Sequence, residues 1–215
     1  DETAERSVED LITEEDMVVT ISNEGYIKRD ATSLYRAQRR GGKGKTAMTT
    51  KDEDFVAQLM VASTHDYLLF FSDRGRVFRK KVYEVPQAGR ATRGKALINL
   101  LPVEKGEKIS ATLAIRDFEG DQYIIMATRN GVIKKTRLSE YQNIRTNGII
   151  AIKIDDDDGL IGVTVSNGEQ DVMLCASNGK AIRFSESDAR PMGRSTRGVT
   201  GMRMPTGEHL ISMTL

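Results

Sequence analysis

Residues 123–138 read YIIMATRNGVIKKTRL, and this stretch decides the fold. Two runs rich in β-branched and other apolar residues flank the Asn-Gly pair at 130–131. Such runs predict β-strands, and an Asn-Gly pair between them favours a type I′ turn, because both central residues of that turn need positive φ. The stretch therefore predicts a β-hairpin, and the Asn-Gly pair at 178–179 predicts the same kind of turn.

The turn of this hairpin has four copies in the chain. They are SNEGYIKR (22–29), SDRGRVFR (72–79), TRNGVIKK (128–135) and ASNGKAIR (176–183). A second glycine-containing marker follows each copy at a similar distance. Its copies are RRGGKGKTAM (39–48), GRATRGKALI (89–98), NIRTNGIIAI (143–152) and GRSTRGVTGM (193–202). Both markers keep a period of about 50 residues, which indicates an internal repeat.

Each repeat is expected to contain four β-strands. In the third repeat the strands are predicted at 108–115, 123–129, 132–138 and 148–154. The sequence shows no long amphipathic helix, and EDLITEED (9–16) predicts one helical turn at most. Four-stranded units at this period are typical of propeller-like arrays, in which each sheet packs on the next. The sequence therefore predicts an all-β, propeller-like fold with about four repeats.

The charge distribution separates an acidic leader from the repeats. Residues 1–16 hold eight acidic residues and one arginine, a net charge of −7. The net charge of the whole chain is +1, so the other residues carry +8. We expect a single domain over 17–215. Its approximate repeats are 17–50, 54–101, 108–154 and 160–204, followed by the opening strand of a fifth repeat at 208–215. That strand either closes a ring of four units, or the chain is a fragment of a larger array.

The composition argues against several classes of protein. The chain has no run of about 18 apolar residues, so no membrane span is predicted. Its first twenty residues are acidic, unlike a signal peptide. Cys175 is the only cysteine, which fits a reducing compartment. These features together predict a cytoplasmic protein.

Cations concentrate at the two repeated markers. If the repeats pack about a common axis, equivalent cations form a curved basic stripe, which matches the regular negative charge of double-stranded DNA. Glycine lets the backbone approach a phosphate, and arginine supplies a planar set of donors. The segment QRRGGKG (38–44) precedes Lys45 and Thr46 but is not a nucleotide-binding P-loop, because Arg39 stands where that motif needs glycine.

The candidate DNA-binding residues come from these markers. They are Gln38, Arg39, Arg40, Gly41, Gly42, Lys43, Gly44, Lys45, Arg76, Arg79, Lys80, Lys81, Arg90, Arg93, Lys95, Lys134, Lys135, Arg145, Arg183, Arg194 and Arg197. Cations that merely protect strand edges from aggregation are the alternative interpretation. Few aromatic residues accompany the basic segments, so base stacking with single strands has weak support.

Several motifs resemble a known family. QRRGGKG (38–44) is similar to the signature box of the C-terminal domain of the DNA gyrase A subunit. The similarity continues through EDLITEED (9–16), THDYLLFFSDRGRV (64–77) and RTNGIIAIKI (145–154), and it spans essentially the whole chain. The resemblance implies a β-pinwheel, a propeller-like fold in which neighbouring blades exchange strands. The family usually has six blades, of which this chain contains about four.

The resemblance also implies a function. It implies a non-catalytic module that bends and wraps duplex DNA around a basic outer rim, and so gives gyrase its directional negative supercoiling. The implied partners are double-stranded DNA, the remaining domains of the gyrase A subunit, and the gyrase B subunit. The parent would be an ATP-dependent type IIA topoisomerase of the bacterial cytoplasm, associated with the nucleoid, which uses ATP and Mg²⁺ in other domains. No cofactor and no membrane contact are expected for this domain.

Two alternatives to the gyrase interpretation stay open. One is a propeller-type scaffold whose basic rim binds an acidic protein. The other is the equivalent domain of topoisomerase IV, which lacks an intact box, so that the box favours gyrase.

No catalytic or metal site is predicted in this chain. His65 and His209 are isolated, and the run Asp155–Asp158 lacks the alternating ligand spacing of an EF-hand. No tyrosine stands in the context of the cleavage tyrosine that the resemblance implies for another domain. We therefore expect no enzymatic activity from the chain alone, and we expect its acidic leader to weaken DNA binding slightly.

Overall fold

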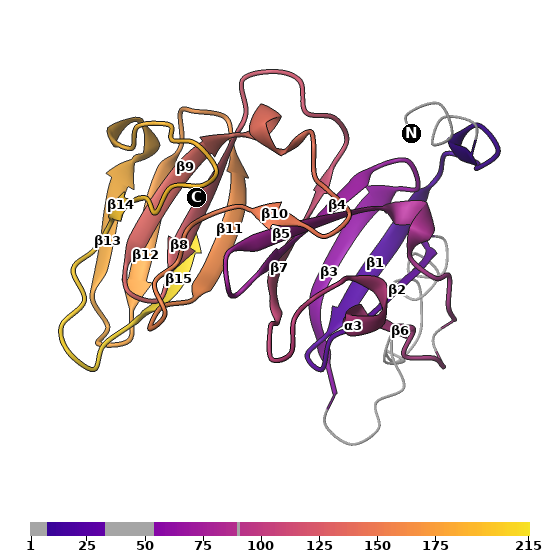
Figure 1. The fold of residues 1–215 in the computed structure, drawn as a ribbon, viewed down its shortest axis with the longest axis horizontal. Helices are drawn as coiled ribbons and strands as arrows, with labels where there is room; N and C mark the ends of the chain where they lie inside the picture. Colours follow the sequence, from indigo (N-terminus) through magenta and orange to yellow (C-terminus); the bar gives the residue numbers. More distant parts are fainter. Residues whose placement is uncertain (1–7, 33–53, 90) are drawn as a thin grey trace, which may run out of the picture. The chain divides into compact units, whose positions relative to one another are not determined.

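The computed structural model describes residues 8–32, 54–89 and 91–215 (Figure 1). Within these residues the chain forms mainly short antiparallel strands, together with the four-residue helix α3 (Leu97–Leu100) and the 3-10 helices η1 (Val82–Glu84), η2 (Leu138–Tyr141) and η3 (Glu186–Asp188). Among the described residues, no helix is long and apolar enough to cross a membrane. The all-β prediction is confirmed.

The strands of the described residues form four sheets. In spatial order the first sheet contains β3 (Val56–Ser63), β1 (Asp16–Ser22), β2 (Tyr26–Ala31) and β6 (Lys95–Ala96). The second contains β10 (Ile149–Ile150), β5 (Arg76–Lys81), β4 (Tyr67–Ser72) and β7 (Ile109–Ile115). The third contains β11 (Leu160–Ser166), β8 (Tyr123–Thr128), β9 (Val132–Arg137) and β14 (Val199–Thr200). The fourth contains β13 (Ala181–Ser185), β12 (Asp171–Ala176) and β15 (Leu210–Thr214).

Each sheet draws its strands from two consecutive repeats. A central hairpin, such as β8–β9, comes from one repeat, whereas the strands beside it come from the next repeat. For β9, the outer partner is the two-residue strand β14, in which Val199 pairs with Ile133. The four strands expected for one repeat therefore do not form one sheet: β8 and β9 lie in the third sheet, while β7 and β10 lie in the second.

The chain divides into two compact units. One comprises Asp1–Leu68, Lys80–Pro102 and Ala114–Asp117, and it contains the first sheet. The other comprises Leu69–Arg79, Val103–Leu113 and Phe118–Leu215, and it contains the third and fourth sheets. The strands of the second sheet are divided between the units.

Burial follows the position of each strand in its sheet. On β12 the side chains alternate, so that Val172, Leu174 and Ala176 are buried while Met173 is exposed. On the central strand β8, residues 124–128 are all buried, as expected for a strand covered on both faces. The residues from β8, β9, β12 and β15 form one hydrophobic core of the second unit.

The hairpin turns differ from the prediction. A type I′ turn at 130–131 would leave two loop residues, but three residues, 129–131, separate β8 from β9. The N–H of Gly131 donates to the carbonyl of Thr128 at 3.0 Å, and the Thr128 hydroxyl accepts from the N–H of Val132 at 3.2 Å. Gly131 has φ of +84°, so the turn is a three-residue loop with glycine in the left-handed region. The I′ prediction is therefore wrong at 130–131. It is also wrong at 178–179, where residues 177–180 separate β12 from β13 and the N–H of Gly179 donates to the carbonyl of Ala176 at 3.1 Å.

Candidate nucleic-acid interface

Glycine loops precede the short outer strands β6, β10 and β14. We use this name for residues 89–94, 143–148 and 193–198. The last glycine of each loop has positive φ: +86° at Gly94, +80° at Gly148 and +89° at Gly198. A Cβ on Gly94 would lie 2.1 Å from the carbonyl oxygen of Ile27, and one on Gly198 would lie 2.3 Å from that of Ile133. Only glycine therefore lets these two loops pack directly on β2 and β9.

The first and third glycine loops contain the same turn. The Thr92 hydroxyl donates to the carbonyl of Gly89 at 3.1 Å, and the Thr196 hydroxyl donates to that of Gly193 at 2.8 Å. In each turn the threonine N–H points to the same glycine carbonyl, at 3.2 Å and 3.4 Å. The two loops thus share a local structure that follows from the repeated Gly-Arg-x-Thr-Arg-Gly sequence.

A buried lysine lies beneath the first glycine loop. Lys28 on β2 has no exposed surface, and its Nζ lies 3.1 Å from the carbonyl oxygens of both Gly89 and Thr92. The ammonium group therefore donates to the backbone of the loop that packs on the same strand.

Lys134 occupies the equivalent position beneath the third loop. It is 1% exposed, and its Nζ donates to the carbonyls of Ala151 at 2.7 Å, of Thr196 at 3.3 Å, and of Arg194. Burial lowers the pKa of Lys134 to about 8; the Glu140 carboxylate acts against this shift and Arg194 adds to it. At neutral pH Lys134 is charged, and its three N–H groups match the three carbonyl oxygens.

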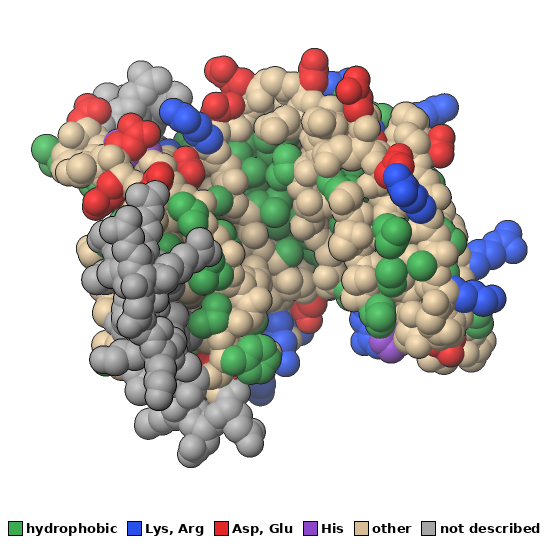
Figure 2. Space-filling view, turned by 180° about the vertical axis from the view of Figure 1, so that it is seen from behind, with side chains coloured by type: hydrophobic (Ala, Val, Ile, Leu, Met, Phe, Trp, Pro, Cys, Tyr) green, Lys and Arg blue, Asp and Glu red, His purple; other side chains and the backbone are tan. Residues whose placement is uncertain are grey.

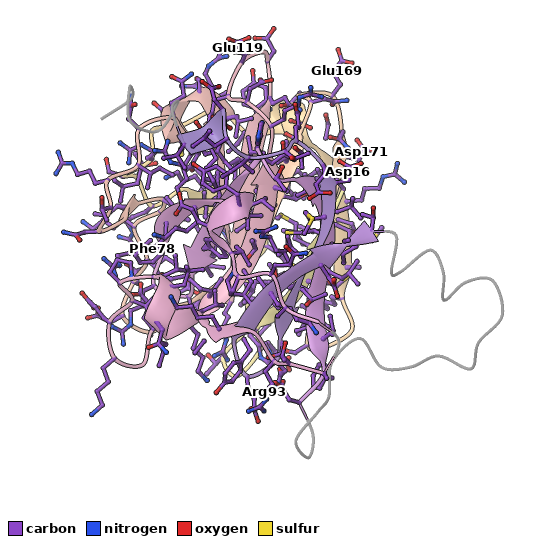
Figure 3. The ribbon with its side chains drawn as sticks, turned by 90° about the vertical axis from the view of Figure 1, so that its right-hand side faces the viewer. Asp16, Phe78, Arg93, Glu119, Glu169 and Asp171 are labelled. Atoms are coloured by element: carbon purple, nitrogen blue, oxygen red, sulfur yellow. The ribbon has the colours of Figure 1, made fainter. Side chains whose placement is uncertain are left out.

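The second glycine loop has a different support. Phe78 on β5, labelled in Figure 3, stands where the other two sheets have a lysine, and its ring lies against Gly148. A Cβ on Gly148 would lie 2.7 Å from the ring carbon Cε1 of Phe78. The Arg76 guanidinium lies 4.7 Å from the centre of the same ring and donates to the carbonyl of Asn147 at 3.1 Å.

Arg76 belongs to a buried ionic network. Its Nη2 lies 2.8 Å from Oε1 of Glu107, its Nε donates to Oε2 at 3.0 Å, and the Ser72 hydroxyl donates to Oε2 at 2.7 Å. Burial raises the pKa of Glu107, but the hydrogen bonds from Arg76, Ser72 and the Glu104 N–H outweigh it and lower the pKa to about 2. The hydrogen bond to Glu107 raises the pKa of Arg76.

Other predicted cations also have structural partners. Lys135 is 5% exposed, and its Nζ lies 3.1 Å from Oε1 of the fully buried Glu186. Burial raises the pKa of Glu186, but hydrogen bonds from the Gln170 N–H, Ser166 and Lys135 outweigh it, so that the net pKa is lowered. These contacts favour a supporting role for Lys135 over direct contact with a phosphate.

Lys81 and Arg93 are half-buried in the first unit. Lys81 Nζ lies 3.1 Å from a carboxylate oxygen of Glu9 in the leader and 3.7 Å from the centre of the Tyr67 ring. Arg93 lies at the end of the first glycine loop, at the lower edge of Figure 3. Its Nη2 is 2.7 Å from Oε2 of Glu24, and its guanidinium stacks over the Tyr26 ring at 4.6 Å.

The remaining described candidates lie nearer the surface. Lys95, Arg145, Arg183 and Arg197 are exposed, whereas Arg79, Lys80 and Arg194 are half-buried. Arg183 and Arg197 pair with Asp171 and Asp155, but all four side chains are about half exposed or more. Figure 2 shows Lys and Arg side chains standing singly at the margin of the part that carries the third and fourth sheets. The box residues 38–44, together with Lys45 and Arg90, lie outside the described residues.

The candidate set omitted Lys28, although its Nζ contacts the first glycine loop as that of Lys134 contacts the third. The signal was present, because Lys28 and Lys134 hold the same position in their aligned markers, IKR and IKK. Among the described residues, His, Cys, Asp and Glu do not gather in groups of three or more that could hold a metal ion. The Asp155–Asp158 run instead forms a turn, in which an Asp158 oxygen accepts from the N–H groups of Asn130 and Gly159.

The fold and these loops define a class of protein: a repeat array of propeller-like sheets whose hairpins are completed by strands of the following repeat. The chain belongs to the family described as DNA gyrase C-terminal domain, β-propeller, which matches residues 16–63, 66–116, 122–167 and 170–215. The resemblance and the propeller-like fold class predicted from the sequence are thereby confirmed.

Relatives and solved structures agree with this family. The chain is 50% identical over 210 residues to the DNA gyrase A subunit of Escherichia coli (strain K12), a match that covers 98% of this chain and 24% of that protein. The chain thus spans about a quarter of the length of the curated relatives it matches. The C-terminal domain of DNA topoisomerase IV has a similar structure, with a TM-score of 0.80, 30% identity and coverage of 95% of this chain and 62% of that one. A gyrase A C-terminal domain gives a TM-score of 0.72 at 26% identity, covering 93% of this chain and 64% of that one.

Proposed function

We propose that this chain is a non-catalytic module that binds duplex DNA and wraps it along a basic rim, as part of a gyrase that introduces negative supercoils. One observation carries the proposal: every described glycine loop presents an exposed cation, Arg145 and Arg197 within their loops and Lys95 directly after the first. Exposed cations in or next to the corresponding loop of successive repeats suit the regularly spaced phosphates of a duplex.

The ion pairs of the exposed cations do not prevent phosphate binding. Arg183 and Arg197 are 68% and 60% exposed, and exposed pairs contribute at most about 1 kcal/mol. A DNA phosphate can therefore replace the carboxylate of Asp171 or Asp155. A buried pair such as Lys135 with Glu186 cannot exchange in this way, because separation leaves an unpaired buried charge.

The proposal extends to partners that match the family. The module would act with the remaining domains of the gyrase A subunit and with the gyrase B subunit, in the bacterial cytoplasm on nucleoid DNA. The ATP and Mg²⁺ of such an enzyme would bind in those other domains, and this chain would need no cofactor of its own.

Salt dependence of DNA binding tests the proposal. The dissociation constant for a mixed-sequence duplex is measured across a range of salt concentrations, for the wild type and for a variant with Lys95→Gln, Arg145→Gln and Arg197→Gln. Each lost phosphate contact should reduce the slope of log K against log salt by about 0.9. The matched control, Lys105→Gln, Lys108→Gln and Arg116→Gln, removes three exposed cations outside the glycine loops and should reduce the slope less. No binding at low salt, or equal losses in both variants, would refute the proposal; a salt-insensitive protein partner would favour a scaffold.

Wrapping is tested separately through the box. Bending a duplex costs several kcal/mol by order-of-magnitude estimates, so a contact at one end of the bent path must resist recoil. Replacing Arg39, Arg40 and Lys43 with Ala should preserve measurable binding and abolish most bending, measured as end-to-end energy transfer on a labelled duplex. The control set is Arg183, Arg194 and Arg197. If bending and binding fall in parallel in both variants, the box has no special role.

A further inference from the structure

We propose that Lys28 and Lys134 are positioning residues for DNA binding: each fixes, through its ammonium group, the glycine loop whose exposed cations meet the phosphates. This inference rests on the proposed function and assigns to it two residues that no phosphate can reach. Lys28 is fully buried and Lys134 is 1% exposed, so neither ammonium can contact DNA while the loop stays folded.

The ammonium group stabilises a backbone arrangement that the loop cannot stabilise alone. In the third loop the carbonyls of Arg194 and Thr196 both point toward Lys134, and the carbonyl of Ala151 joins them. Converging carbonyl dipoles repel each other unless a donor lies between them, and a buried acceptor without a donor costs about 1–3 kcal/mol. Lys134 supplies one N–H to each carbonyl and so holds Arg194 and Thr196 in place.

The cations of the loop project from the backbone that Lys134 holds. Arg194 is itself one of the residues whose carbonyl accepts from Lys134, and its side chain donates to the carbonyl of Ile150 at 3.2 Å. Arg197 directly follows Thr196, and its side chain is 60% exposed. By fixing the backbone at Arg194 and Thr196, Lys134 therefore also fixes the backbone from which the side chains of Arg194 and Arg197 extend.

The first sheet repeats the arrangement independently. Lys28 Nζ donates to the carbonyls of Gly89 and Thr92, which are the sequence equivalents of Gly193 and Thr196. The exposed Lys95 and the half-buried Arg93 follow within three residues of Thr92. Two buried lysines at the same repeat position, each donating to a loop rich in cations, argue against an incidental contact.

A double-mutant cycle distinguishes positioning from other effects. Lys134→Met keeps most of the aliphatic stem and removes the donors. We expect it to weaken binding of a mixed-sequence duplex about three- to tenfold in the wild-type background. In a background that already carries Arg194→Gln and Arg197→Gln the same change should have almost no effect, because the groups that Lys134 positions are gone. Lys28→Met serves as the matched control, since it acts on the first loop and should remain additive with those two changes.

Further measurements separate positioning from loss of the fold. Thermal unfolding shows whether Lys134→Met is folded, and Lys134→Arg, which retains donors, should recover part of the affinity. Amide hydrogen exchange in residues 193–198 should accelerate in Lys134→Met and not in Lys28→Met. Equal loss of affinity in both backgrounds, or unchanged exchange, would overturn the inference. If the wild type itself binds no DNA, the proposed function fails, while hydrogen exchange still reports whether Lys134 holds the loop.

Discussion

The second and third sheets support equivalent glycine loops in different ways. In the third sheet Lys134 donates to loop carbonyls, and Gly198 packs against the backbone of Ile133. In the second sheet Phe78 takes the place of the lysine, and Gly148 packs against its ring. Both glycines keep φ between +80° and +89°. The backbone of the loop is therefore the constant feature, and a polar or an aromatic side chain can support it.

The difference also changes what a cation at these positions means. Lys134 and Phe78 are equivalent in sequence, and Lys134 is 1% exposed with its ammonium group against its glycine loop. Arg76 compensates in the second sheet, where it stacks on Phe78 and donates to the carbonyl of Asn147 in the glycine loop. Charge counted along the sequence therefore overstates the charge that is available to a phosphate.

Alanine at the loop glycines should give the largest effects. Gly198→Ala forces a Cβ to within 2.3 Å of a backbone carbonyl at positive φ, and we expect a loss of unfolding free energy of more than about 3 kcal/mol. At Gly148 the added Cβ would lie 2.7 Å from the ring of Phe78 and 3.0 Å from the carbonyl oxygen of Val77. This is a less severe approach to the backbone than at Gly198, so the loss should be smaller, about 2 kcal/mol. Gly179→Ala, at φ of +82° with open space around it, should cost about 1 kcal/mol. Chemical denaturation measures all three, and equal losses at Gly148 and Gly198 would contradict the contrast between the two supports.

Breaking a buried ion pair should give the next largest loss of unfolding free energy. Glu107→Gln leaves the buried side of Arg76 without its carboxylate, and we expect a loss of about 3 kcal/mol. Because Arg76 also contacts Phe78 and the second glycine loop, hydrogen exchange in residues 143–148 should accelerate as well. The control is Asp171→Asn, which breaks the exposed pair with Arg183 and should cost less than about 1 kcal/mol. A loss at Glu107 no larger than at Asp171 would show that the second sheet does not depend on this network.

The low pKa of Glu107 predicts a specific acid sensitivity. Its pKa is about 2 in the folded protein and near 4.5 when unfolded, so the unfolded state takes up the proton first as pH falls. The stabilisation is therefore complete above about pH 4.5 and is lost as pH decreases toward 2, by about 2–3 kcal/mol in total. Denaturation at several pH values should show this loss in the wild type and a smaller loss in Glu107→Gln. Identical pH profiles would mean that other carboxylates account for the acid sensitivity.

The sequence predicted the hairpins and the repeat because both depend on local properties. Runs of β-branched residues favour strands. Gly94, Gly148 and Gly198 mark loops in the sequence, because a backbone with positive φ favours glycine. The sequence could not predict which face of the sheet carries Lys134. Residues 133–136 of β9 are all buried, so no alternation of buried and exposed residues distinguishes the two faces. The pairing of two-residue strands such as β14 depends on contacts between repeats, which local patterns do not encode.

The last residues of β5 and β9 are both cations, but one is half-buried beside a neighbouring segment and the other is exposed. Lys81 and Arg137 are sequence equivalents, and each lies over a tyrosine ring, Tyr67 or Tyr123. Arg137 is exposed, whereas Lys81 is 12% exposed and pairs with Glu9 of the acidic leader. The leader thus occupies a cation that the sequence had assigned to DNA binding.

Releasing Lys81 from the leader should give the smallest effect. Glu9→Gln removes the carboxylate that lies 3.1 Å from Lys81 Nζ, so it frees one cation and removes one negative charge from the leader. We expect about twofold tighter DNA binding at low salt, with the gain disappearing as added salt screens the charges. Asp10→Asn makes the same charge change one residue away and should give a smaller gain, because the contact with Lys81 persists. If the two variants behave alike, only the overall charge of the leader affects binding, and the contact between Glu9 and Lys81 does not keep Lys81 from DNA.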